Sequence, residues 1–113
     1  MPSSGIWINL ILLCIAEIFG DFQLKFFARG DQLVNLGGGI AGYLGVVYFA
    51  IKCFKSANVL FINGVWDGMS AILESIAAFV ILGERLSDWK QYLGLLLIIA
   101  GIFTFRIGKI PYE

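Results

Sequence analysis

The chain has 113 residues, of which 59% are hydrophobic and 14% are charged, and its net charge at neutral pH is zero. This length allows a single domain, and this composition lies far outside the usual range of soluble proteins. A soluble bundle would need a polar face on each helix, whereas residues 34–51 contain no charged side chain. The composition therefore predicts a protein whose solvent is the lipid bilayer.

Four segments are long and apolar enough to cross a bilayer, which takes about 20 mostly apolar residues per helix. They are residues 5–27, 33–54, 57–82 and 89–107, and only short links remain between them. Links this short make consecutive helices antiparallel. The sequence thus predicts an all-α membrane protein, in which residues 1–113 form one domain of four transmembrane helices in the cell membrane.

The first segment carries ionisable side chains inside its apolar stretch. Glu17 lies near its middle, and Asp21 and Lys25 follow at intervals of four residues, on one side of a helix. Ionisable side chains at membrane depth are costly, and they usually face a bundle interior or a water-filled path. Asp21 has a structural alternative, the neutralisation of Lys25, so Glu17 is the stronger candidate for binding protons or substrate.

The second and fourth segments contain small residues at spaced positions. Glycine weakens a helix in water, but between membrane helices it allows close approach of the backbones. Gly38 and Gly42 therefore predict that the second helix serves mainly for packing. Gly94 and Gly101 are seven residues apart on one face of the fourth helix, which can pack against another helix, including one from a second subunit.

The third segment carries a second strip of polar side chains. The strip recurs at spacings of four, three and four residues and consists of Asn63, Asp67, Ser70 and Glu74, with Trp66 adjacent to it. We expect the first and third helices to face each other across an acidic and aromatic cavity, which suits cations. Structural alternatives remain, because Asp67 can hydrogen-bond within the bundle and Glu74 can pair at an interface.

No enzyme motif accompanies these carboxylates. The chain has no His, its two Cys residues form no cluster, and it contains no nucleophile motif and no phosphate-binding loop. We therefore expect no enzymatic activity, no cofactor, no bound metal and no nucleic-acid partner. Carboxyl groups remain as candidates for proton exchange near neutral pH, since burial and neighbouring like charges both raise a carboxyl pKa.

The basic residues are divided evenly between the two sides of the predicted four-span topology. One side holds Lys52, Lys55, Arg106 and Lys109, and the other holds Lys25, Arg29, Arg85 and Lys90. Lys and Arg normally mark the cytoplasmic side, so this rule gives the chain no preferred orientation. A chance distribution or misplaced helix ends would give the same count. We favour a dual-topology chain that pairs with an inverted copy, an architecture known among transporters.

Four short motifs resemble one family of membrane transporters. They are residues 16–20 (AEIFG) followed by Lys25, residues 64–68 (GVWDG), residues 83–86 (GERL) and residues 94–101 (GLLLIIAG). Together they resemble the small multidrug resistance transporters, within the drug and metabolite transporter superfamily, over nearly the whole chain. The resemblance implies an antiparallel dimer, of identical or related chains in membrane lipid, that exports small cations in exchange for protons. It also implies that Glu17 binds proton and substrate in turn and that Trp66 lines the binding site.

The chain also departs from the pattern of that family. Asn63 stands where many members have a Tyr, and Ser70 stands where a Gly is common. Asp21 and Glu74 are additional acids. An acid directly after the Trp, here Asp67, is similar to polyamine-exporting members, so we expect a polyamine or a quaternary ammonium compound as substrate. Two alternatives remain open: a metabolite transporter or lipid-linked sugar flippase subunit of the same superfamily, and a small non-transporting subunit of a larger membrane complex.

Overall fold

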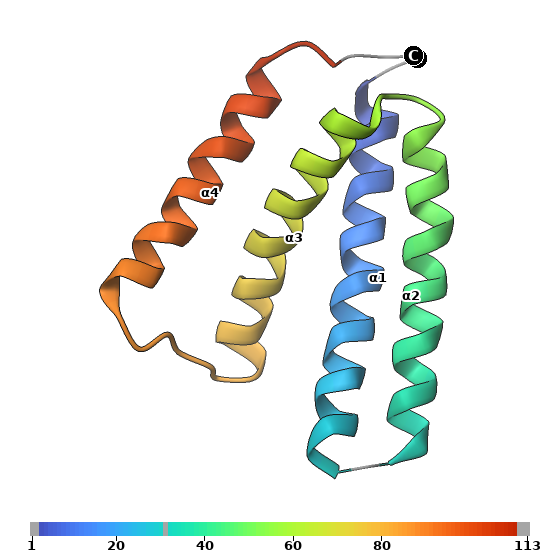
Figure 1. The fold of residues 1–113 in the computed structure, drawn as a ribbon, viewed down its shortest axis with the longest axis vertical. Helices are drawn as coiled ribbons and strands as arrows, with labels where there is room; N and C mark the ends of the chain where they lie inside the picture. Colours follow the sequence, from blue (N-terminus) through green and yellow to red (C-terminus); the bar gives the residue numbers. More distant parts are fainter. Residues whose placement is uncertain (1–2, 31, 111–113) are drawn as a thin grey trace. The chain divides into compact units, whose positions relative to one another are not determined.

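The computed structural model describes residues 3–30 and 32–110, which form four helices (Figure 1). They are α1 (Ser3–Gly30), α2 (Leu33–Phe54), α3 (Val59–Ile81) and α4 (Trp89–Ile107). At 1.5 Å per residue they are about 28 to 42 Å long, and a bilayer core is about 30 Å thick. All four are apolar enough to cross a membrane. The expectation of an all-α, four-span membrane protein is therefore confirmed.

Contacts divide the chain into two compact units, with the boundary between Ser56 and Ala57. The first unit contains α1 and α2, and the second contains α3 and α4. In each unit the two helices are joined by a short link and run antiparallel (Figure 1). Each unit is described separately below.

Glycines bring the backbones of α1 and α2 close together. A Cβ atom added to Gly42 would lie 2.6 Å from the Cα atom of Gly20 and 2.9 Å from the carbonyl oxygen of Ala16, both on α1. The buried residues of α2 form one stripe at intervals of three or four, namely Gly39, Gly42, Val46, Ala50 and Cys53. Small residues in this stripe allow the close approach that the sequence predicted for the second helix.

The N-terminus of α3 is capped by Asn58, whose Oδ1 accepts a hydrogen bond of 2.9 Å from the backbone N–H of Phe61. This bond satisfies an N–H group that has no partner within the helix, so α3 begins at Val59 rather than at residue 57. Glycines of α3 face α4. A Cβ atom on Gly64 would lie 2.7 Å from Cζ of Phe105, and one on Gly68 would overlap Cδ1 of Ile102.

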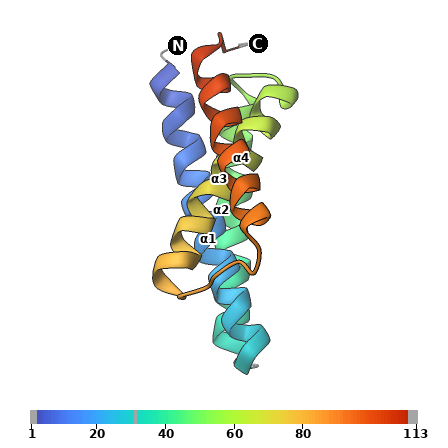
Figure 2. The ribbon, with the colours of Figure 1, turned by 90° about the vertical axis from the view of Figure 1, so that its left-hand side faces the viewer.

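Figure 2 shows the backbone of the link between α3 and α4, and side chains of this link bond to the ends of both helices. Gly83 has a φ of +69°, a left-handed conformation that glycine adopts without strain and that ends α3. Nη1 of Arg85 donates to the carbonyl oxygen of Phe79 at 3.0 Å, and the guanidinium carbon lies 3.6 Å from the centre of the Phe79 ring. At the start of α4, the Asp88 carboxylate accepts from the backbone N–H of Lys90 at 3.0 Å. The link therefore holds the ends of both helices.

The first helix is longer than the sequence indicated. The sequence placed its end near residue 27, but α1 continues through Gly30. Residues 25–29 include good helix formers, and Arg29 in the last turn interacts favourably with the partial negative charge of a helix C-terminus.

Candidate functional site

Glu17 lies at mid-depth in the membrane-spanning part of α1. That part runs from Gly5 to Gly30, so Glu17 is 12 residues from its start and 13 from its end. At 1.5 Å per residue the carboxylate is about 18 Å from either end along the helix. Its side chain is partly buried, as is that of Asp21 one helical turn further on. An acidic side chain at this depth is costly for a structural protein, and such residues mark ion or substrate pathways.

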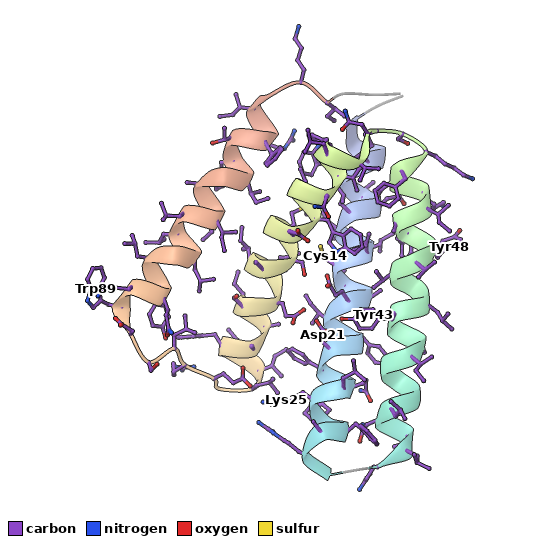
Figure 3. All side chains as sticks on the ribbon, viewed as in Figure 1. Cys14, Asp21, Lys25, Tyr43, Tyr48 and Trp89 are labelled. Carbon is purple, nitrogen blue, oxygen red and sulfur yellow. The ribbon has the colours of Figure 1, made fainter. Side chains whose placement is uncertain are left out.

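Asp21 is held by a residue of α2. The hydroxyl group of Tyr43 donates a hydrogen bond to Oδ1 of Asp21, and Figure 3 labels both residues, at similar heights along α1 and α2. The Tyr43 ring lies against Gly20, where an added Cβ atom would be 2.9 Å from its Cδ2 atom. The absence of a side chain at position 20 therefore makes room for the ring whose hydroxyl reaches position 21.

Tyr43 was not among the site residues predicted from the sequence. A signal was present, because Tyr43 follows Gly39 by four residues and so lies on the same side of α2. Gly39 packs against α1, where its Cβ atom would lie 2.5 Å from Cδ2 of Leu24. A polar aromatic residue one turn from a packing glycine is placed to reach the neighbouring helix.

A second hydrogen bond joins the same two helices nearer their link. Nδ2 of Asn35 donates to Oε1 of Gln23 at 2.9 Å. Gly38 lies beside this pair, since an added Cβ atom would be 2.7 Å from the same Oε1 atom. Of the glycines proposed for packing, Gly38 and Gly42 therefore both lie in the contact between α1 and α2.

The polar strip of α3 lies on a different face from the glycines that contact α4. At 100° per residue, the strip of Asn63, Asp67, Ser70 and Glu74 falls within an arc of about 60°. Gly64 and Gly68 are centred about 110° away from it by the same count. Asn63 and Asp67 are exposed, whereas Trp66, Ser70 and Glu74 are partly buried, with Oε1 of Glu74 shielded from solvent. The strip thus lies away from the glycine contact with α4, exposed at Asn63 and Asp67 and partly buried at Ser70 and Glu74.

Among the residues that the structure describes, no group of three or more His, Cys, Asp and Glu side chains is arranged to hold a metal ion. The acids instead lie in pairs along single helices: Glu17 and Asp21 are one turn apart on α1, and Asp67 and Glu74 are two turns apart on α3. Carboxylates in this arrangement can bind protons and organic cations, which require no fixed coordination geometry.

Comparison with known proteins identifies the family. A family model described as Small Multidrug Resistance protein matches residues 5–98, which include most of α1, all of α2 and α3 and the first half of α4. The chain belongs to the small multidrug resistance family. It is therefore a transporter with several spans in the cell membrane, as the sequence motifs predicted.

Relatives of this small multidrug resistance protein cover most of its length. Multidrug resistance protein EbrB of Bacillus atrophaeus is 32% identical over 90% of this chain and 86% of its own. Quaternary ammonium compound-resistance protein QacE of Escherichia coli is 25% identical over 89% of this chain and 91% of its own. A putative ethidium bromide resistance protein of Pseudomonas aeruginosa is 27% identical over 88% of this chain and 86% of its own.

Two predicted features of this family member involve more than one unit or more than one chain. Gly94 and Gly101 are open, because an added Cβ atom at either position would meet no described atom within 4 Å. Their face stays a predicted contact surface for another helix. The strip of α1 and the strip of α3 belong to different units, and their pairing across a cavity also stays a prediction.

Proposed function

We propose that this protein exports small organic cations, either polyamines or quaternary ammonium compounds, in exchange for protons. The observation that carries the proposal is the position of Glu17, a partly buried carboxyl group at mid-depth of α1 in a small multidrug resistance protein. The names of the relatives, which refer to quaternary ammonium compounds and to ethidium bromide, support a cationic substrate.

The exchange follows from the cost of a charge inside a membrane. A deprotonated Glu17 is stabilised by a cation beside it, and without a cation it is neutralised by a proton. A carboxyl group that has bound a proton no longer carries the negative charge that attracts a cation. Cation binding therefore displaces the proton, and proton binding displaces the cation. Alternating exposure of this group to the two sides then couples the two flows in opposite directions.

The polar strip of α3 supplies further contacts for a cation. Trp66 offers an aromatic face that attracts positive charge, and Asp67 lies next to it on the same helix. Asn63, Ser70 and Glu74 extend the strip over three turns. Several spaced acids favour a substrate with more than one positive charge, which supports the polyamines among the candidate substrates.

The working unit in this proposal is an antiparallel dimer, with an identical or a related chain as the partner. The even division of Lys and Arg between the two sides supports insertion in both orientations. The open face at Gly94 and Gly101 supports packing of α4 on a second subunit. Two inverted copies would enclose a pathway that a single four-helix chain leaves open.

The test is proton-driven exchange in lipid vesicles that contain the purified protein alone. A pH gradient should drive uptake of radiolabelled 1,4-diaminobutane or tetraethylammonium by the wild type. Glu17→Gln keeps the size of the side chain and removes its charge, so it should abolish exchange. Glu84→Gln removes an acid from the link beyond α3 and should retain exchange. Exchange by Glu17→Gln at the wild-type rate would refute the assignment.

A further inference from the structure

The carboxylate of Asp21 is fixed in direction by a residue of another helix. Tyr43 of α2 donates its hydroxyl hydrogen to Oδ1 of Asp21 on α1. A carboxylate has about four acceptor positions on its two oxygens, so one bond from Tyr43 leaves capacity for a further donor. The bond thus orients Asp21 without using up its ability to bind a ligand.

The Tyr43 side chain that makes this bond lies against a glycine contact between the two helices. Its ring packs on Gly20, and the backbones of α1 and α2 touch at Gly20 and Gly42, one residue before Asp21 and one before Tyr43. The ring is therefore supported on the side of Gly20, while the side chain as a whole is 36% exposed. Such support is what holds a binding group in a productive geometry.

We infer that Tyr43 is a positioning residue, which aims the Asp21 carboxylate at the second ammonium group of a doubly charged amine bound at Glu17. The inference rests on the proposed function and deepens it, since it names the class of substrate. Glu17 and Asp21 are four residues apart on one helix and so about 6 Å apart along its axis. A four-carbon chain between two ammonium groups spans this separation.

The chemistry of recognition separates this substrate from singly charged amines. Each primary ammonium group carries three N–H donors, which form short and strong hydrogen bonds with carboxylates. A diamine engages both Glu17 and Asp21, whereas a monoamine of the same chain length engages only one of them. Loss of the Tyr43 hydroxyl should therefore weaken diamine binding selectively.

The experiment compares 1,4-diaminobutane with 1-aminobutane, by calorimetric binding to the purified full-length protein in detergent. Tyr43→Phe removes only the hydroxyl and keeps the ring on Gly20. We expect it to weaken diamine binding by about 10-fold, the loss of one hydrogen bond to a charged group. Monoamine binding should change by less than about 2-fold, as in matched Tyr48→Phe, which alters an exposed Tyr on the same helix.

A double-mutant cycle identifies the residue through which Tyr43 acts. Asp21→Asn can still accept from Tyr43, so it preserves the helix contact while removing the charge. If Tyr43 acts through Asp21, the double variant should bind diamine no worse than Asp21→Asn alone. If the two substitutions instead reduce diamine affinity independently, so that their fold-losses multiply in the double variant, the inference is wrong. It is also wrong if Tyr43→Phe weakens the binding of both amines equally, because the bond would then be purely structural. Absence of any amine binding by the wild type would overturn the proposed function itself, and unchanged diamine binding by Tyr43→Phe would overturn only the positioning role.

Discussion

The contact between α1 and α2 at Gly42 can be tested by adding one methyl group. In Gly42→Ala the new Cβ atom would lie 2.6 and 2.7 Å from the Cα and N atoms of Gly20 and 2.9 Å from the Ala16 carbonyl oxygen. All three are backbone atoms of α1, so no side chain can rotate away. Ordinary contact begins at 3.4 Å, which means that the helices must separate by about 0.8 Å at this point.

The size of the effect follows from two opposing terms. Overpacking of a tight contact costs about 1–3 kcal/mol. Replacement of Gly by Ala within a helix stabilises the folded state by about 0.5–1 kcal/mol, because Ala loses less backbone entropy on folding. We therefore expect Gly42→Ala to lower the free energy of unfolding by up to about 2.5 kcal/mol, and by about 1–3 kcal/mol relative to a Gly-to-Ala change that makes no such contact.

Gly37→Ala is the matched control, because Gly37 lies on the same helix and an added Cβ atom there meets no described atom within 4 Å. It should leave stability unchanged or raise it by up to about 1 kcal/mol. Unfolding of both variants by SDS in mixed micelles, followed by circular dichroism, gives the two values. Equal stability of Gly42→Ala and Gly37→Ala would refute the close approach of α1 and α2.

Two further predictions concern the link and the topology. Arg85→Gln removes the guanidinium from the Phe79 carbonyl and ring, so the free energy of unfolding should fall by about 1 kcal/mol and amide exchange should quicken at residues 82–85. Arg85→Lys keeps the positive charge but lacks the planar guanidinium group, so its free energy of unfolding should fall by nearly as much. Wild-type stability in Arg85→Lys would show that the charge alone matters. Addition of three Lys residues after Glu113 should bias every copy toward one orientation and lower transport, because positive charge favours the cytoplasmic side. Labelling of a Cys introduced near the C-terminus, in a background without Cys14 and Cys53, reads the orientation, and wild-type label on one side only would contradict dual topology for a homodimer.

The four spans could be predicted because hydropathy and length alone determine them. The apolar runs and the absence of charge over residues 34–51 require no knowledge of which helices touch. The motifs around Glu17 and Trp66 also identified the family, which the match over residues 5–98 confirmed. Local composition was sufficient for these conclusions.

The contacts between helices could not be predicted in the same way. Hydropathy gives no register between two helices, so the bond from Tyr43 to Asp21 depends on where Gly20 and Gly42 meet. For the same reason the sequence marked Arg85 only as a charge and as part of the motif at residues 83–86, with no contact assigned to it. The structure shows that its guanidinium caps the end of α3, a role that depends on the turn at Gly83.

The central claim is that proton and cation compete for the carboxyl group of Glu17. Its most direct test is the number of protons released when 1,4-diaminobutane is added to purified protein in weakly buffered detergent solution, followed with a pH indicator. The wild type should release protons in proportion to the amine bound, and Glu84→Gln should match it. Glu17→Gln should release far fewer protons at the same occupancy. Equal release by the wild type and Glu17→Gln would contradict the account, because the displaced proton would then come from a different group.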